Sequence, residues 1–181
     1  MNERKVVLYI SMSLDGFIAR ENDDLSWLSL VAKEGEDYGY NGMIERSDAY
    51  IVGRRTFEIV KKHTGGDFPM AKVMDCYVIT GQEIDDEGVR SYSGNIKSLI
   101  QELKLGQGKD IYCDGGSEVV RQLMEENLID EYIISIIPII LGNGIRLFSG
   151  IKNGISVELK ELNQYESGLV KLIYRRADYS I

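Results

Sequence analysis

The strongest fold signal in the sequence is a strand-like run, a glycine turn and an amphipathic helix that follow one another directly. Residues 110–113 are interpreted as a short strand. Gly115-Gly116 then indicates a tight turn, and Ser117 is a suitable N-cap for a helix. The apolar face of that helix consists of Val119, Val120, Leu123 and Met124, with Asn127 placed to end it. A strand, a tight turn and a helix in succession form the building unit of α/β folds.

Strand and helix signals alternate in this way along the rest of the chain. The expected strands are 5–12, 48–52, 73–80, 89–92, 110–113 and 130–141, and the expected helices are 34–44, 54–62, one that starts after Asn95, and 117–127. Helical crossovers between strands make those strands parallel. Residues 157–162 and 169–175 alternate apolar and polar residues around a turn, which predicts a terminal antiparallel pair. The sequence therefore predicts one α/β domain over residues 1–181, with a mostly parallel sheet and antiparallel C-terminal strands.

Composition argues against several classes of partner and site. The formal charge of -8 disfavours nucleic acid or an anionic membrane as the main partner, because both favour a basic surface. The apolar stretch 6–10 is too short for a signal peptide, and no run reaches the length of a membrane span, so we expect a cytoplasmic protein. Cys76 and Cys113 lie in apolar runs and are expected to be buried, reduced thiols. With His63 they match no familiar zinc spacing, so we expect no metal site.

Two glycine turns after expected strands have the composition of an anion site. In Gly53-Arg54-Arg55-Thr56, unpaired N–H groups at a helix start combine with a hydroxyl and two guanidinium groups, and two solvated arginines are the plain alternative. In Gly115-Gly116-Ser117 the glycines would let a phosphate approach the backbone, although a purely structural turn is at least as common. Ligands favour the carboxyl ends of parallel strands, so a pyrophosphate-containing dinucleotide could span both turns.

Several carboxylates are candidates for acid–base chemistry. Asp15 follows the first expected strand in a turn, where an Asx-turn is the alternative explanation. Glu34, Glu36 and Asp37 lie on the weak helix signal, where a solvated helix face is the alternative. Trp27 follows a polar loop and either anchors that loop or lines a ligand pocket. Asp15 and Asp37 are our candidate catalytic acids, and Trp27 is our candidate substrate contact.

These segments, in their order along the chain, resemble the dihydrofolate reductase superfamily over nearly its whole length. The likeness is greatest to the branch that includes the C-terminal reductase domain of the bacterial bifunctional riboflavin-biosynthesis protein. The matching residues are Ser13-Leu14-Asp15-Gly16-Phe17-Ile18-Ala19, Trp27-Leu28, residues 48–58, Tyr77-Val78-Ile79-Thr80, Asp114-Gly115-Gly116-Ser117, Leu128-Ile129-Asp130-Glu131, Pro138, Leu141-Gly142-Asn143-Gly144 and Leu147-Phe148. The resemblance implies a three-layer α/β/α fold and an NADPH-dependent reductase that transfers a hydride to a small heterocyclic substrate. Such a substrate is reduced by 5-amino-6-(5-phosphoribosylamino)uracil reductase and by dihydrofolate reductase.

The resemblance also implies which residues hold the cofactor. By it, Gly53, Arg54, Arg55 and Thr56 would hold the adenosine phosphates, with Thr80 and Gly81 beside the adenosine half. Gly115, Gly116, Ser117 and Glu118 would close over the pyrophosphate, and Ser11, Ile18 and Ala19 would flank the nicotinamide.

The chain also departs from that pattern in ways that leave its substrate open. Ser26 replaces the proline that usually precedes Trp27, residues 34–40 contain no arginine, and the zinc deaminase signatures are absent. A nucleotide-binding module that acts as a sensor or scaffold without catalysis is the alternative function. The apolar C-terminal strands further predict a homodimer.

Overall fold

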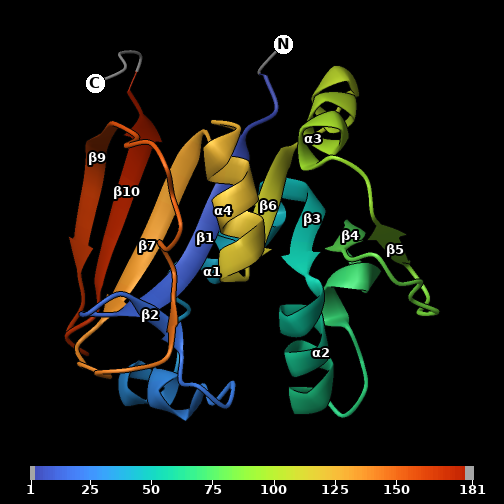
Figure 1. Cartoon of the computed structure of the whole chain (residues 1–181). Coiled ribbons are helices and arrows are strands. Elements are labelled where there is room, and N and C mark those ends of the chain that lie inside the picture. Colours follow the sequence, from blue (N-terminus) through green and yellow to red (C-terminus); the bar gives the residue numbers. More distant parts are fainter. Residues whose placement is uncertain (1–2, 178–181) are drawn as a thin grey trace.

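The computed structural model describes residues 3–177 and consists of a central sheet with helices on both faces (Figure 1). The large sheet has eight strands in the order β5-β4-β3-β6-β1-β7-β10-β9. Their bounds are β1 (Val6–Ser13), β3 (Ser47–Gly53), β4 (Asp75–Ile79), β5 (Val89–Tyr92), β6 (Asp110–Gly115), β7 (Glu131–Ile137), β9 (Val157–Gln164) and β10 (Val170–Arg176). Two short strands, β2 (Phe17–Ala19) and β8 (Ile145–Arg146), form a second sheet. The helices are α1 (Tyr40–Glu45), α2 (Arg54–His63), α3 (Ile96–Leu105) and α4 (Ser117–Glu125), with 3₁₀ helices η1 (Ser26–Val31) and η2 (Pro69–Lys72).

The strand directions confirm the expected fold class. In the part of the sheet ordered β5-β4-β3-β6-β1-β7, each neighbouring pair of strands is parallel. Strand β10 pairs antiparallel with both β7 and β9. The parallel strands are joined through helices, except β4 and β5, which a loop connects, whereas the turn between β9 and β10 makes that pair antiparallel.

Alternating residues of the sheet divide the core between its two faces. Val6 and Leu8 of β1 pack under α3 and α4, while Val7 points to the opposite face with Met43 of α1 and Phe57 of α2. Figure 1 shows α4 in front of the sheet and α1 behind it. A strand buried on both faces must be apolar at consecutive positions, which explains the continuous apolar run of β1.

Helix ends agree with the sequence where the signal is a local hydrogen bond. The Asn95 side chain accepts from the Lys97 N–H at 2.8 Å and caps α3, as expected. Ser117 was the wrong choice for the cap of α4, because β6 continues through Gly115 and leaves Gly116 in the cap position, with Ser117 as the first helical residue. Asn127 has a φ of 53°, the left-handed conformation expected just beyond a helix end.

Two expected elements are shorter in the structure. The helix expected over 34–44 occupies only Tyr40–Glu45, because Gly35, Tyr38 and Gly39 all have positive φ and interrupt any earlier turn of helix. The strand expected over 130–141 ends at Ile137, directly before Pro138, which has no N–H to continue the ladder between β1 and β10.

Cys76 and Cys113 are buried free thiols, and burial raises the pKa of each to about 12. Over residues 3–177, no group of three or more acidic, histidine or cysteine side chains could hold a metal ion. Within the same residues, every helix is too short or too polar to cross a membrane.

Candidate functional site

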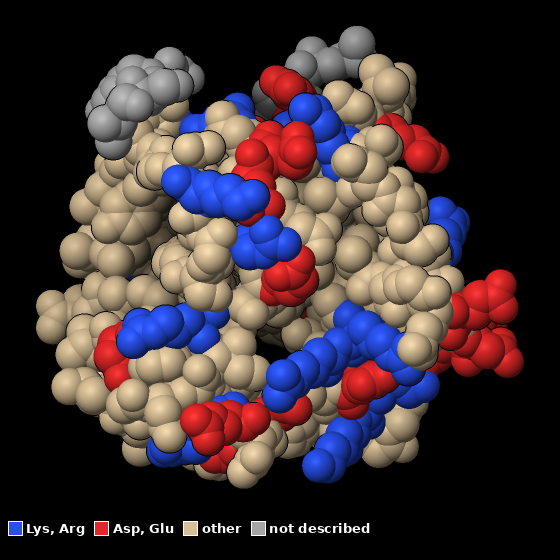
Figure 2. Space-filling model, viewed as in Figure 1, with Lys and Arg blue, Asp and Glu red and all other residues tan. Residues whose placement is uncertain are grey.

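A cavity of about 820 Å³ opens at the carboxyl ends of the parallel strands. Its wall includes Ser11 from β1, Gly53 from β3, Ile79 from β4, Asp114 from β6 and Ile137 from β7. In Figure 2 the molecule is hollowed on this face, and basic and acidic side chains lie around the opening. The carboxyl ends of parallel strands are the usual place for a ligand in an α/β fold.

The first glycine turn joins β3 to α2 and leaves the start of that helix uncapped. Gly53 occupies the N-cap position, and no side chain caps the helix, so its first N–H groups are available to a ligand. A Cβ on Gly53 would lie 3.3 Å from Cγ2 of Val119 and 3.7 Å from the N of Gly116, both at the start of α4. A larger residue at position 53 would therefore crowd the Val119 side chain at the start of α4.

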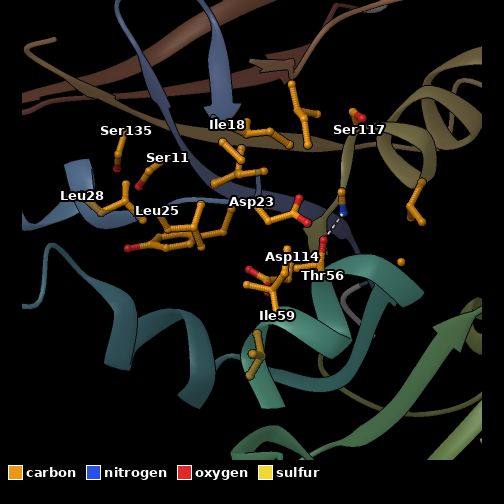
Figure 3. Close-up of a pocket in the computed structure, with 18 of the residues that line it drawn as sticks. Ser11, Ile18, Asp23, Leu25, Leu28, Thr56, Ile59, Asp114, Ser117 and Ser135 are labelled. Carbon is orange, nitrogen blue, oxygen red and sulfur yellow. Dashed lines mark hydrogen bonds between the residues drawn. The ribbon is translucent and has the colours of Figure 1, made fainter. Parts of the chain in front are cut away.

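The second glycine turn lies against the first and is tied to it by a hydrogen bond. Gly115 has a φ of 100°, a conformation that favours glycine, and a Cβ there would lie 3.0 Å from Cδ1 of Ile10. The N–H of Gly116 donates to Oγ1 of Thr56 at 3.1 Å, and Figure 3 shows this bond. The α4 helix that follows also has no side-chain cap.

Two neighbouring helix starts and two arginines make this end of the cavity suited to phosphates. Each uncapped start presents free N–H groups and the positive end of a helix dipole. Arg54 pairs with Glu58 at 2.6 Å and also donates to Gln82, while Arg55 pairs with Asp23 at 2.7 Å. The pair of Arg54 with Glu58 is solvent-exposed, so a phosphate can replace the Glu58 carboxylate at small cost. The Asp23 side chain is less exposed, at 30%, while its partner Arg55 is 61% exposed.

Most of the residues proposed to bind a cofactor line this cavity. They are Ser11, Ile18, Ala19, Gly53, Arg54, Arg55, Thr56, Gly116, Ser117 and Glu118. Gly115, Thr80 and Gly81 are not part of its lining; Thr80 accepts from the Gln82 N–H at 3.1 Å, beyond the end of β4. Glu118 pairs with Arg121 along its own helix.

Asp15, a candidate catalytic acid, lies outside the cavity lining. Its carboxylate accepts from the Ser13 hydroxyl at 2.6 Å, the Gly142 N–H at 2.8 Å and the Leu141 N–H at 3.1 Å. These bonds, led by the one from Ser13, lower the pKa of Asp15 to about 2. The hydrogen bonds of Asp15 thus hold the loop after β7 in place. An ionised carboxylate of this kind donates no proton near neutral pH.

Asp37, the second candidate, does line the cavity together with Glu36. It accepts from the Gly39 N–H at 2.8 Å and the Asn41 N–H at 3.0 Å, and these bonds lower its pKa. Asp37 is therefore ionised and suited to attract a donor or a cation. Glu34 lies outside the lining.

Trp27 is buried in a separate apolar cluster with Phe17 and Leu141. The ring is outside the cavity lining, whereas its neighbours Leu25 and Leu28 are part of it. The structure thus places Trp27 as an anchor that holds η1 against the cavity.

Asp114 is a cavity residue that the sequence did not single out as an acid. It is the residue before the last of β6 and lies at the cavity wall, and its carboxylate accepts from the hydroxyl groups of Tyr50 and of Tyr112, the latter at 2.9 Å. Burial raises its pKa, although the two hydrogen bonds act in the opposite direction. The sequence held one signal: Tyr112 and Asp114 are two residues apart and so share a face of the strand.

Aromatic rings surround the space beside Asp114. The rings of Tyr9 and Tyr40 are 6.1 Å apart, and those of Tyr9 and Tyr112 are 6.0 Å apart, nearly perpendicular. All three line the cavity. Burial, with Asp37 nearby, raises the pKa of Tyr9 to about 12, so its hydroxyl stays protonated.

Comparisons with known proteins agree with this architecture. The uncharacterized protein YwjB of Bacillus subtilis (strain 168) is 40% identical over 179 residues, which cover 97% of this chain and 99% of that protein. The crystal structure of a putative riboflavin biosynthesis protein from Shewanella sp. PV-4 superimposes with a TM-score of 0.86 at 26% identity, covering 96% of this chain and 99% of that one. The deaminase/5-amino-6-(5-phosphoribosylamino)uracil reductase of Thermotoga maritima shares the fold, with a TM-score of 0.73 at 16% identity over 97% of this chain and 57% of that one.

The family model described as RibD C-terminal domain matches residues 4–171, which is nearly the whole chain. The matched region contains both glycine turns, the cavity between them and the strands that carry them. The chain belongs to the RibD C-terminal domain family, whose fold is that of riboflavin-pathway reductase domains.

Proposed function

We propose that the protein is an NADPH-dependent reductase that acts on a small heterocyclic substrate. The observation that carries the proposal is the pair of uncapped helix starts, α2 and α4, held together by the bond from Gly116 to Thr56. A pyrophosphate with a further phosphate at one end matches this arrangement, because each helix start attracts one anionic group.

The residues of the cavity fit such a dinucleotide along its length. Arg54 and Arg55 would hold phosphate at the α2 end, and the first N–H groups of α4 with Ser117 would hold the pyrophosphate. Ile18 and Ala19 of β2, with Ser11, would form the wall beside the nicotinamide. When bound, the nicotinamide supplies the hydride, and the protein positions the substrate and manages a proton.

Asp114 is the residue that we propose to hold that proton. Its carboxyl group lies at the cavity wall between the two glycine turns and the tyrosines, and burial favours its protonated form. Tyr50 and Tyr112 fix the orientation of the carboxyl group. Asp15 and Asp37 are less suited, because hydrogen bonds keep both of them ionised.

The test combines nucleotide binding with turnover. NADPH should bind to the purified protein and raise its melting temperature, and NADPH oxidation should follow with a dihydropteridine or a ribosylaminopyrimidine as substrate. Absence of binding by both NADPH and NADH would contradict the proposal. Binding without oxidation across the substrate panel would instead favour a sensor or scaffold that binds NADP(H) without catalysis.

A further inference from the structure

The cavity has two ends with opposite chemistry. Figure 3 shows Thr56 and Ser117 on one side and Ser11, Leu28 and Ser135 on the other, with Asp114 between. We call the second region the aromatic end. It consists of Tyr9 and Ser11 of β1, Ser135 and Ile137 of β7, the lining residues of η1 and of the segment 32–40, and Tyr112 with Leu169.

The charges at the aromatic end are negative. Glu36 and Asp37 line it, while Asp114, whose protonated form is favoured by burial, lies at its border with the phosphate end. Of the described lining residues, only Arg54 and Arg55 are basic, and both belong to α2 at the phosphate end. Lys171 lies near Asp37 but outside the lining, where its ammonium donates to the Tyr38 carbonyl at 3.0 Å and faces the Tyr165 ring.

The walls of the aromatic end suit a flat ring. Tyr9, Tyr40 and Tyr112 surround it, and Leu28 and Leu169 add aliphatic surface. Such walls bury a planar aromatic ring through apolar contact and edge-to-face packing. Ser11 and Ser135 lie opposite each other in the β1–β7 register and offer hydroxyl groups to polar atoms on the edge of a ring.

These two properties together define a class of substrate. A substrate phosphate in the aromatic end would lie among carboxylates with no lining cation to neutralise it, which disfavours its removal from water. A ring with N–H donors or a positive charge would instead be attracted by Glu36 and Asp37.

We propose that the aromatic end takes a planar aromatic heterocycle that is neutral or positively charged and carries no phosphate. This inference rests on the proposed function, since the phosphate end is then reserved for the dinucleotide. It separates the protein from the reductase of Thermotoga maritima, whose name specifies a phosphoribosylamino substrate.

The experiment measures binding of matched pairs that differ by one phosphate. The probes are riboflavin and riboflavin 5'-phosphate, uridine and uridine 5'-phosphate, and pyridoxine and pyridoxine 5'-phosphate, titrated calorimetrically with and without saturating NADP⁺. In at least one pair the unphosphorylated member should bind about tenfold more tightly, as expected for one unfavourable charge contact. Equal or tighter binding of the phosphorylated member in the NADP⁺-saturated protein would overturn the inference, and so would failure of every unphosphorylated ring to bind.

Variants show whether the carboxylates cause the discrimination. The double variant Glu36→Gln, Asp37→Asn should narrow the ratio of the two dissociation constants within a pair. The control Glu34→Gln removes one charge from the same segment but outside the lining, and it should leave that ratio unchanged. Ala32→Arg adds a cation at the aromatic end and should improve binding of the phosphorylated member. An unchanged ratio in the double variant would refute the role of the carboxylates. Failure of NADP⁺ to bind would count against the proposed function, whereas NADP⁺ binding together with equal or tighter binding of the phosphorylated rings would count against this inference alone.

Discussion

Replacing Arg54 and Arg55 together by alanine should weaken the binding of NADPH more than that of NADH. Only NADPH carries a 2'-phosphate, and these two residues are the basic members of the described cavity lining. Arg54 reaches from the start of α2 to Gln82 beyond β4, and Arg55 faces Asp23 across the cavity. A phosphate bound at the α2 end therefore lies within reach of at least one guanidinium.

The size of the effect follows from the bonds that are exchanged. A hydrogen bond between charged groups contributes about 1.5–3 kcal/mol. Each arginine first gives up an ion pair, and since the Arg54 and Arg55 side chains are 40% and 61% exposed, such a pair contributes only about 0.2–1 kcal/mol. A net loss of about 1–2 kcal/mol for each engaged arginine corresponds to a roughly 5- to 30-fold weaker affinity for NADPH. The affinity for NADH should fall about twofold or less, because NADH loses only a screened, long-range attraction to the two arginines.

The assay is a fluorescence titration of both reduced nucleotides at fixed ionic strength, with the single variants measured beside the double. Arg90→Ala is the matched control, because Arg90 is an exposed cation on β5 that stacks on Tyr77, outside the cavity lining. Equal losses for NADPH and NADH would refute the reasoning, since the arginines would then contact a group common to both nucleotides.

Three further predictions concern acid chemistry, stability and assembly. Asp114→Asn should lower kcat on the order of a hundredfold and leave NADPH affinity unchanged in titrations, as expected on loss of a proton donor; an unaltered kcat would exclude Asp114 from proton transfer. Asp15→Asn should lower the melting temperature at neutral pH. Because the pKa of Asp15 in the folded state is lowered from 3.8 to about 2, its stabilisation is complete above pH 3.8 and disappears as the pH falls through 2. The melting temperatures of wild type and Asp15→Asn should therefore converge as the pH falls through that window. A difference in melting temperature that does not shrink by pH 2 would argue against the Asp15 hydrogen bonds as its cause. The double variant Leu159→Asp, Leu162→Asp should convert the homodimer expected from the C-terminal strands into monomer in sedimentation, because these leucines are 47% and 57% exposed on edge strand β9. The control Leu105→Asp on α3, at 89% exposure, should leave the dimer intact. A wild-type protein that sediments as monomer at micromolar concentration would contradict the dimer.

The parts of the fold and the site that depend on local chemistry could be predicted from the sequence. The glycine turns at Gly53 and at Gly115 were predicted because a strand end, a flexible backbone and a helix start all follow from neighbouring residues. The end of the sheet formed by β9 and β10 was predicted for the same reason, since a turn and alternating residues specify an antiparallel pair.

The acid–base residues depend on contacts between distant segments, and there the sequence was a weaker guide. Asp114 acquires its environment from Tyr50, which β3 places opposite Tyr112 of β6, and no spacing along the chain reveals that register. The Asp15 carboxylate lies outside the cavity lining, where it accepts a hydrogen bond from the Leu141 N–H. Positive φ values in residues 35–39 shorten the helix that carried Asp37 in the prediction, so that Asp37 precedes α1.

The adjacency of β3 and β6 has a consequence for how this scaffold tolerates change. The chain leaves the sheet centre after Gly53, builds β4, β5 and α3 at one edge, and returns to place Gly115 beside its starting point. This segment of the chain begins and ends at the two glycine turns, but its exposed connection at residues 81–88 lies at neither turn. Insertions, deletions or a new pair of termini in residues 83–88, beyond the contact between Gln82 and Arg54, can therefore be introduced while the spacing of the two turns stays constant, which makes this segment a suitable position at which to lengthen, tag or permute the protein.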